Sequence, residues 1–205
     1  MTRFPSRRWG GIAMRLDDLD YRELLLMDPA GGAIRFAGER ALVLDPIGMG
    51  LLRRQLVDAL GFEEARALIT RVAFARGVRL AAAVERELEW DREEDRPRGA
   101  ARLLALAGLF RLTGADEPLA SEGVVAEASY EAEQHLAHLG RSDVAVCWTT
   151  CGLLSGLLSR MEGRRIYVLE GHCAGKGDAA CRLLARPAEA WGAEHAAALR
   201  GYESA

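Results

Sequence analysis

A group of residues that could bind a metal ion lies near the C-terminal end of this 205-residue sequence. The chain has four cysteines, which are Cys147, Cys151, Cys173 and Cys181. Glu170 and His172 lie shortly before the third of them. Thiolate, imidazole and carboxylate groups are the ligands that zinc prefers, and thiols in a reducing compartment rarely form structural disulfides. The clustering therefore indicates metal or redox chemistry.

Three other kinds of site fit this segment less well. A phosphate-binding loop would need one more residue between its glycines than "GHCAGKGD" provides, and Gly177 stands where the loop needs Ser or Thr. A thioredoxin-type redox pair needs C-x-x-C, which no two of the cysteines form. His172 adjoins Cys173, but successive strand residues point to opposite faces, so His172 is poorly placed as a base for a nucleophilic thiol. We therefore assign no catalytic residue.

The spacing favours a closed tetrahedral metal site. Cys147 and Cys151 are four residues apart and would share one face of a helix. Cys173 and Cys181 flank a glycine-rich turn, so a β-hairpin would bring them together. From spacing alone the four cysteines form the first quartet, with Glu170 and His172 as substitutes for one of them. Thiols that serve only as small buried side chains remain the alternative.

Apolar periodicity and turn residues predict the elements that would hold these side chains. We expect a hairpin over 33–45, an apolar segment over 100–113 that ends as a strand, further strands at 122–129, 164–171 and 180–185, and helices at 46–60, 62–90, 129–140, 148–163 and 187–202. The apolar faces of the first two helices would be formed by Leu52, Leu56, Leu60, Phe62, Leu68, Ile69, Val72, Leu80 and Val84. The order of elements favours a single α/β (α+β) domain with a mostly antiparallel sheet and flanking helices.

Two polar segments are expected to be exposed. The run "DREEDRPRG" (91–99) has the composition of a charged linker. His135 and His138 lie three residues apart on the helix over 129–140, where a solvated face is favoured over a metal-binding pair.

Composition limits the classes of function. The formal net charge is −3 and the isoelectric point is about 5.9, so no basic surface for nucleic acid is indicated. The N-terminus lacks the apolar region of a secretory signal, and no segment has the roughly 18 consecutive apolar residues that a membrane helix needs. We expect a cytoplasmic protein without a membrane partner.

Several segments together resemble a known family. "SYEAEQHL" (129–136), "VCWTTCGLLSGLLS" (146–159), "YVLEGHC" (167–173) and "GKGDAAC" (175–181) resemble the sensor domains of aromatic-responsive, sigma-54-dependent activators, whose C-terminal half is a 4-vinyl-reductase-type domain. The resemblance extends over about residues 20–195. It implies a structural zinc ion on a hairpin, bound by Cys147, Glu170, Cys173 and Cys181. Glu170 thereby replaces Cys151 in the quartet, and Lys176 and the turn amides are the groups expected to offset its negative charge.

The resemblance also implies an effector pocket beside the zinc ion. Its walls would include Leu104, Leu106, Val124, Ala126, Cys151 and Val168. Phenol-sensing members hydrogen-bond the hydroxyl through a His and a Trp, and these positions fall near Leu104 and on Ala126. Because neither donor is present, a hydroxylated ligand loses its advantage, and we expect a hydrocarbon-like or bulkier aromatic effector.

The resemblance divides the chain into four parts. Residues 1–30 would be an N-terminal extension and candidate dimerisation element, 31–120 the first part of the sensor, 121–195 the zinc- and effector-binding part, and 196–205 the start of a linker. It implies a homodimeric, non-enzymatic module that controls a linked ATPase domain. The alternatives are a stand-alone 4-vinyl-reductase-like protein of tetrapyrrole (bacteriochlorophyll) metabolism and a zinc-stabilised scaffold without a small ligand. The segment "WGAEHAAALRGY" (191–202) resembles the helix before the linker, which favours an excised sensor over a stand-alone protein.

Overall fold

Two antiparallel sheets and a set of helices make up the residues that the computed structural model describes, which are 24–87, 95–113 and 123–202. The first sheet has the order β1-β2-β3 and the second β4-β5-β7-β6. The strands are β1 (Leu25–Asp28), β2 (Ala33–Phe36), β3 (Glu39–Ala41), β4 (Arg111–Thr113), β5 (Val124–Glu127), β6 (Ile166–His172) and β7 (Cys181–Pro187). The helices are α2 (Pro46–Leu60), α3 (Phe62–Glu87), α4 (Asp95–Leu106), α5 (Tyr130–Leu139), α6 (Trp148–Glu162) and α7 (Ala196–Leu199). The expected α+β domain with a mostly antiparallel sheet is confirmed.

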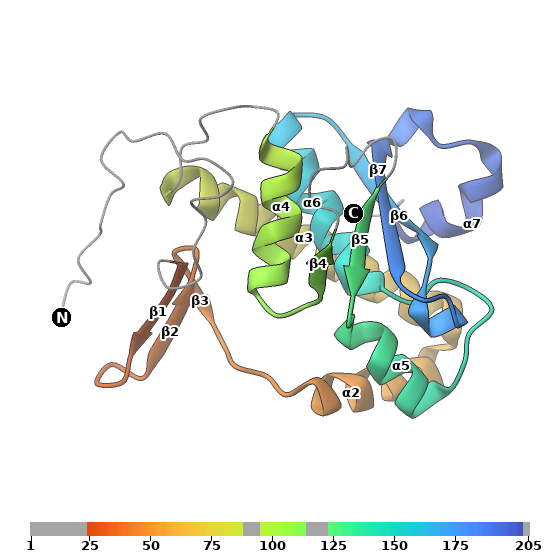
Figure 1. The fold of residues 1–205 in the computed structure, drawn as a ribbon, viewed down its shortest axis with the longest axis horizontal. Helices are drawn as coiled ribbons and strands as arrows, with labels where there is room; N and C mark the ends of the chain where they lie inside the picture. Colours follow the sequence, from red (N-terminus) through yellow and green to blue (C-terminus); the bar gives the residue numbers. More distant parts are fainter. Residues whose placement is uncertain (1–23, 88–94, 114–122, 203–205) are drawn as a thin grey trace.

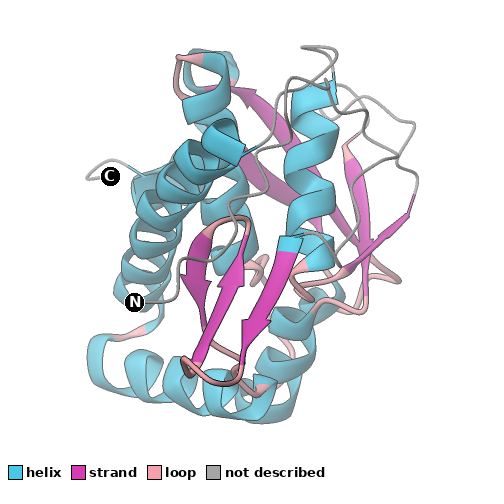
Figure 2. Ribbon diagram, turned by 90° about the vertical axis from the view of Figure 1, so that its left-hand side faces the viewer, coloured by secondary structure: helices cyan, strands magenta, loops and turns pink. Residues whose placement is uncertain are grey.

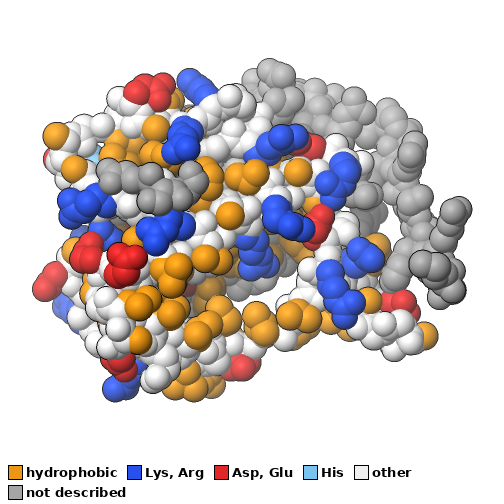
Figure 3. Space-filling model, turned by 180° about the vertical axis from the view of Figure 1, so that it is seen from behind, with side chains coloured by type: hydrophobic (Ala, Val, Ile, Leu, Met, Phe, Trp, Pro, Cys, Tyr) orange, Lys and Arg blue, Asp and Glu red, His pale blue; other side chains and the backbone are white. Residues whose placement is uncertain are grey.

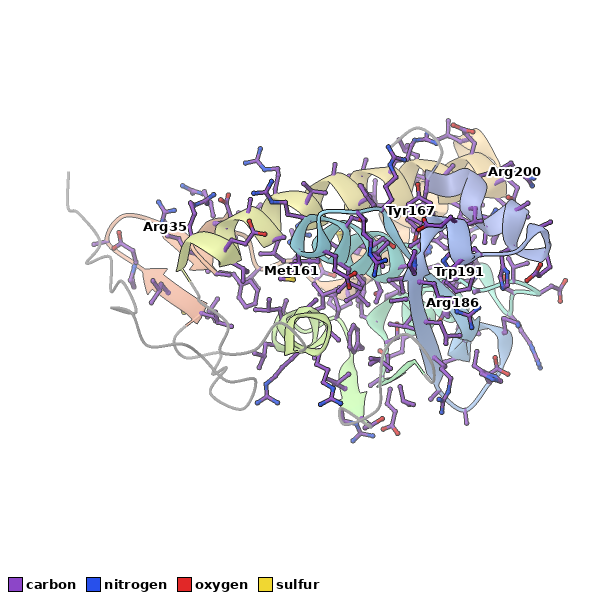
Figure 4. All side chains as sticks on the ribbon, turned by 90° about the horizontal axis from the view of Figure 1, so that it is seen from above. Arg35, Met161, Tyr167, Arg186, Trp191 and Arg200 are labelled. Atoms are coloured by element: carbon purple, nitrogen blue, oxygen red, sulfur yellow. The ribbon has the colours of Figure 1, made fainter. Side chains whose placement is uncertain are left out.

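Helix α6 lies at the centre of the molecule (Figure 1), where it packs against α3, against α4 and against β6 of the four-stranded sheet. Buried residues of these elements form the main core. The three-stranded sheet stands apart at one end, in front of the helices in Figure 2. A second cluster lies under the C-terminal turns, where Tyr167 and Trp191 lie close together (Figure 4) and the rings of Tyr167 and Tyr202 stack at 4.4 Å.

The N-terminus of α2 follows from its sequence. The Asp45 carboxylate accepts a hydrogen bond of 2.7 Å from the Gly48 amide, and Pro46 occupies the first helical position. Gly61 ends the helix with φ of 81°, a conformation that favours glycine. The face that α2 buries differs from the prediction, because Gly50 and Arg53 are buried.

Leu52 and Leu60 of the predicted apolar face are 53% and 45% exposed. Buried polar contacts of Arg53, described below, fix the rotation of α2 about its axis. The pattern of apolar residues in the sequence does not predict these contacts.

Small residues form the closest contacts between α3 and α6, although Val84 of the predicted apolar face is buried and Leu80 packs against the core. Val72 is 62% exposed, whereas Ala73 and Ala81 are buried. A Cβ atom added at Gly77 would lie 2.2 Å from the Leu153 carbonyl oxygen, and one at Gly156 would lie 2.1 Å from that of Phe74. The two backbones therefore touch along this contact.

Three other expectations are corrected. Helix α4 begins at Asp95, inside the segment 91–99 that was expected to be a linker, and Gly99 is buried. Residues 188–202 form short 3₁₀ turns and the four-residue α7 instead of one helix. The predicted hairpin over 33–45 ends at Ala41 and is joined by an unpredicted strand, β1. Most of the N-terminal extension, residues 91–94 and the turn "GADEP" (114–118) lie outside the described residues.

No helix in the described part of the chain combines the length and the apolar character that crossing a membrane would require.

Candidate metal centre and effector pocket

Three thiols and one carboxylate converge where α6 meets the β6–β7 hairpin. Cys147 is the N-cap of α6, Glu170 lies on β6, Cys173 follows that strand and Cys181 begins β7. One ligand atom from each residue lies within 4.8 Å of all the others. The three thiols are at most 2% exposed. The structure thus brings together the four residues that the resemblance implies, and Cys151 is not among them.

An irregularity in the hairpin shapes this cluster. Glu170 pairs with Leu183 while His172 pairs with Arg182, so the register shifts by one residue at Gly171. Such a bulge re-aims the side chains that flank it. His172, the other substitute ligand that spacing had allowed, is 65% exposed and is not a member of the cluster.

The turn that follows is held by a side-chain hydrogen bond and by backbone hydrogen bonds. The Asp178 carboxylate accepts a hydrogen bond of 2.7 Å from the Cys173 amide, and the Cys173 carbonyl oxygen accepts from the Lys176 and Asp178 amides. Gly177 has φ of 96°, which suits glycine. A Cβ atom at Gly175 would lie 2.4 Å from a Val146 methyl group, so this position also requires glycine.

The cluster has the chemistry of a cation site. The Cys147 amide donates to Glu170 Oε2 at 3.0 Å, and the amides of Val146 and Ala174 donate to the sulfurs of Cys173 and Cys181 at 3.5 and 3.4 Å. Glu170 Oε1 is buried and has no partner, and Glu170 forms no ion pair within the described residues. Burial, and next the charge of Cys173, raise the pKa of the Glu170 carboxyl to about 8. A buried carboxylate beside three thiols without a counter-charge fits a divalent metal ion.

Of the groups expected to offset the negative charge of the cluster, backbone amides contact it and the Lys176 ammonium does not. The Lys176 ammonium forms no hydrogen bond or ion pair with any residue that the structure describes, although the Lys176 carbonyl oxygen accepts from Arg141. Amides that donate to thiolates are a usual surrounding of metal-bound cysteine.

A buried ion pair that sequence reasoning missed supports the start of α6. Glu131 of α5 is 1% exposed and accepts hydrogen bonds from the Thr149 and Thr150 amides at 2.9 and 2.7 Å and from the Thr150 hydroxyl at 2.8 Å. A carboxylate at this position satisfies two amides that have no partner within the helix and interacts favourably with the helix dipole. Arg53 of α2 completes the charge pair at 3.2 Å.

Arg53 also contacts both neighbours of Cys147, a candidate metal ligand. Its guanidinium donates to the Val146 carbonyl oxygen and lies 3.9 Å from the centre of the Trp148 ring. The ion pair therefore fixes α2 and α5 to the segment that carries Cys147. Two features of the sequence could have indicated this ion pair. Arg53 lies next to the apolar positions of α2, and Glu131 lies two positions after the Ser129 cap.

His135 corrects the expectation of a solvated face on α5. Its side chain is 2% exposed and makes edge contacts with Phe62 and Trp148. Burial, and next the charge of Arg53, lower the pKa of His135 to about 4. The neutral imidazole is thus a core side chain and takes no part in the metal cluster.

The predicted effector-pocket residues lie in one apolar region. Leu106 packs against the main core. The other five are buried members of that core: Leu104, Val124, Ala126, Cys151 and Val168. Ala126 pairs with Cys181 of the candidate metal cluster across β5 and β7, so this region adjoins that cluster. Burial raises the pKa of the Cys151 thiol well above its usual range.

The buried hydroxyl groups of Ser155 and Tyr202 are already engaged in hydrogen bonds within the protein. Tyr202 donates to the Val168 carbonyl oxygen at 2.8 Å, and the Ser155 hydroxyl lies 2.7 Å from the Cys151 carbonyl oxygen and 3.1 Å from the Tyr202 hydroxyl. The Ser155 oxygen also accepts from the Val168 amide at 2.8 Å.

Comparison with known proteins agrees with this arrangement. Residues 20–116 match the family described as activator of aromatic catabolism, and residues 126–187 match the 4-vinyl-reductase-type domain. The phenol regulator MopR of Acinetobacter guillouiae is 26% identical over 181 residues, which are 85% of this chain and 32% of that protein. The transcriptional regulatory protein XylR of Pseudomonas putida is 31% identical over 169 residues, 80% of this chain and 30% of that protein. The chain thus spans about a third of the length of these relatives.

A solved structure shares the fold. The phenol-responsive sensory domain of the transcription activator PoxR, crystallised with phenol, superposes with a TM-score of 0.76 at 29% identity. The match covers 92% of this chain and 95% of that one. These similarities are to regulators, and they do not favour the tetrapyrrole alternative. The chain belongs to the sensory domains of aromatic-responsive, sigma-54-dependent transcriptional activators.

Proposed function

We propose that this chain senses a small, apolar, aromatic or hydrocarbon-like effector in the pocket beside Ala126 and Cys151, next to a structural zinc ion. The observation that carries the proposal is the position of this apolar region directly beside the metal cluster, through the pairing of Ala126 with Cys181. Cys147, Glu170, Cys173 and Cys181 would bind the ion. Zinc would cross-link α6 to the hairpin and contribute to folding free energy.

The chemistry of the pocket supports a ligand without a hydroxyl group. The predicted walls carry no hydroxyl, amide or imidazole, and the hydroxyls of Ser155 and Tyr202 already bond within the protein. A buried ligand hydroxyl would lose its water without gaining a partner, which costs about 1–3 kcal/mol. A hydrocarbon has no such cost.

The relatives are regulators, and this suggests what binding would achieve. Effector binding would shift an equilibrium between two states of the sensor and release a linked ATPase domain from repression, provided that the effector binds the two states differently. We place the protein in the cytoplasm, where zinc-binding thiols stay reduced, and expect it to act as a homodimer.

Calorimetric titration of the zinc-loaded chain tests the ligand class. We expect toluene or a larger aromatic hydrocarbon to bind more tightly than phenol. Phenol binding more tightly than every hydrocarbon tested would contradict the proposal. Absence of binding by all of them, with zinc bound, would favour a zinc-stabilised scaffold.

A further inference from the structure

A cavity lies at the edge of the predicted effector-pocket region, between the three-stranded sheet, α3 and α4. Its volume is about 210 Å³, and its lining includes residues of β2, β3, α3 and α6. Leu104 is the one residue of the predicted pocket that it also touches. A cavity of about 150 Å³ can hold benzene, so this one has room for a single ring with a substituent.

The inner wall of this cavity is apolar. Leu104 and Leu153 are at most 2% exposed, and Phe36, Leu80 and Leu109 pack against the same core. Among the described residues that line the cavity, those of α4 and α6 are uncharged. It therefore suits the hydrocarbon part of a ligand.

The remaining wall is positively charged. Arg40, Arg76 and Arg79 belong to the lining, with Glu39 as the single acidic residue. Glu39 is paired mainly with Arg86, at 2.8 Å, and lies 3.8 Å from Arg79.

Two of these arginines have capacity to bind an anion. The Arg76 guanidinium makes no hydrogen bond or ion pair with any described residue, and the side chain of Arg79 is 80% exposed. Both lie on the C-terminal part of α3 beside the three-stranded sheet, which Figures 1 and 4 show at the same end of the molecule. Three guanidinium groups around an apolar wall leave an excess of positive charge that a neutral hydrocarbon would not use.

We propose that this cavity binds a single-ring aromatic carboxylate. The ring would lie against Leu104 and Leu153, and the carboxylate would accept hydrogen bonds from Arg76 and Arg79, since guanidinium groups match carboxylate geometry. The site shares only Leu104 with the predicted walls of the effector pocket. Contact with Leu104 would let a ligand in this cavity influence that pocket, although binding does not depend on such coupling.

Calorimetric titration of the zinc-loaded chain with benzoate and with benzyl alcohol, a neutral molecule of similar size, tests the inference. We expect benzoate to bind at least about tenfold more tightly, and its affinity to fall as salt is raised from 0.05 to roughly 0.5 M, because salt screens exposed charges. Equal binding of the two compounds, or tighter binding of benzyl alcohol, would overturn the inference.

Variants locate the site. The double substitution R76Q/R79Q should reduce benzoate affinity about tenfold or more and leave benzyl alcohol binding unchanged. The exposed Ala107 also lines the cavity, so Ala107→Phe should fill it and abolish benzoate binding while zinc content and melting temperature stay the same. The double substitution R54Q/R200Q removes the same charge from exposed positions outside the lining and should bind benzoate as the parent does.

Unchanged benzoate binding in R76Q/R79Q, or an equal loss in R54Q/R200Q, would refute this site. Titration of the parent chain with toluene and with benzoate separates the two proposals. If the parent chain binds benzoate but not toluene, only the proposed function is overturned. Binding of toluene without benzoate would overturn this inference alone.

Discussion

At the scale of single residues, the metal cluster depends on one carboxylate that has no partner in the protein. Glu170 Oε1 is buried without a hydrogen bond, and three thiols surround it. Cys151 has the same chemistry as the cluster thiols but lies one helical turn after Cys147 and is not a member of the cluster. Substitution of Glu170 should therefore reduce metal binding, whereas substitution of Cys151 should not.

Glu170→Ala should lower zinc content and stability, because the ion loses a ligand and structural zinc contributes folding free energy. Cys151→Ser should keep one zinc per chain. Metal analysis of purified protein and thermal unfolding with and without a chelator measure both effects. Loss of zinc in Cys151→Ser with full zinc in Glu170→Ala would instead support the four-cysteine site.

Arg53→Met should destabilise the chain by about 3–5 kcal/mol, because Glu131 would remain as an uncompensated buried charge. Urea unfolding measures the change. Arg54→Met, at the neighbouring position where the side chain is 53% exposed, should change stability by less than about 1 kcal/mol. Similar values for the two variants would show that the buried pair has no special role.

At the scale of elements, the contact between α3 and α6 fixes the centre of the fold. Gly77, Gly152 and Gly156 allow the two backbones to touch. Helix α6 carries Cys147 at its start and Cys151 one turn later. The close packing therefore sets the position of the candidate metal cluster and of Cys151 in the proposed pocket wall.

Gly156→Ala should destabilise the fold by about 1–3 kcal/mol, because the added methyl group would force the helices apart. Gly201→Ala is a suitable control, since its Cβ atom would meet the Thr70 side chain no closer than 3.5 Å, and it should change stability by less than about 0.5 kcal/mol. Chemical denaturation compares the two. A neutral Gly156→Ala would mean that α3 and α6 can separate at little cost.

At the scale of the whole molecule, an exposed apolar strip supports the proposed homodimer. Hydrophobic side chains run along the lower edge of the face shown in Figure 3. The strip consists of Leu42, Val43, Leu44, Ile47, Leu51 and Leu52, each at least 51% exposed. Contiguous apolar surface of this kind usually marks an interaction site.

The double substitution V43K/L51K should therefore convert a dimer to a monomer while zinc content is retained. Light scattering after gel filtration measures the mass. Leu136→Lys, which places a charge at a 42% exposed leucine outside the strip, should leave the dimer intact. A monomeric parent chain, or an unchanged dimer in V43K/L51K, would contradict this role of the strip.

The sequence by itself determined the features that depend on residue type and short-range spacing. The cap at Asp45, the ends of α2 and α6 at Gly61 and Gly163, and the β6–β7 turn follow from local conformational preference. The thiols were recognisable because cysteine clusters report their chemistry directly. Resemblance to the sensor family then supplied Glu170, which spacing alone had placed only among the substitutes.

Only the tertiary structure decided which faces of the helices are buried. The burial of Arg53, Glu131 and His135 depends on partners far away in the sequence, and the exposure of Val72 follows from a glycine contact with α6. Apolar periodicity describes one helix at a time. The position of each helix depends on its contacts with other elements. Here these are the backbone contact between α3 and α6 and the buried pair of Arg53 and Glu131. Such contacts form only when the chain is folded.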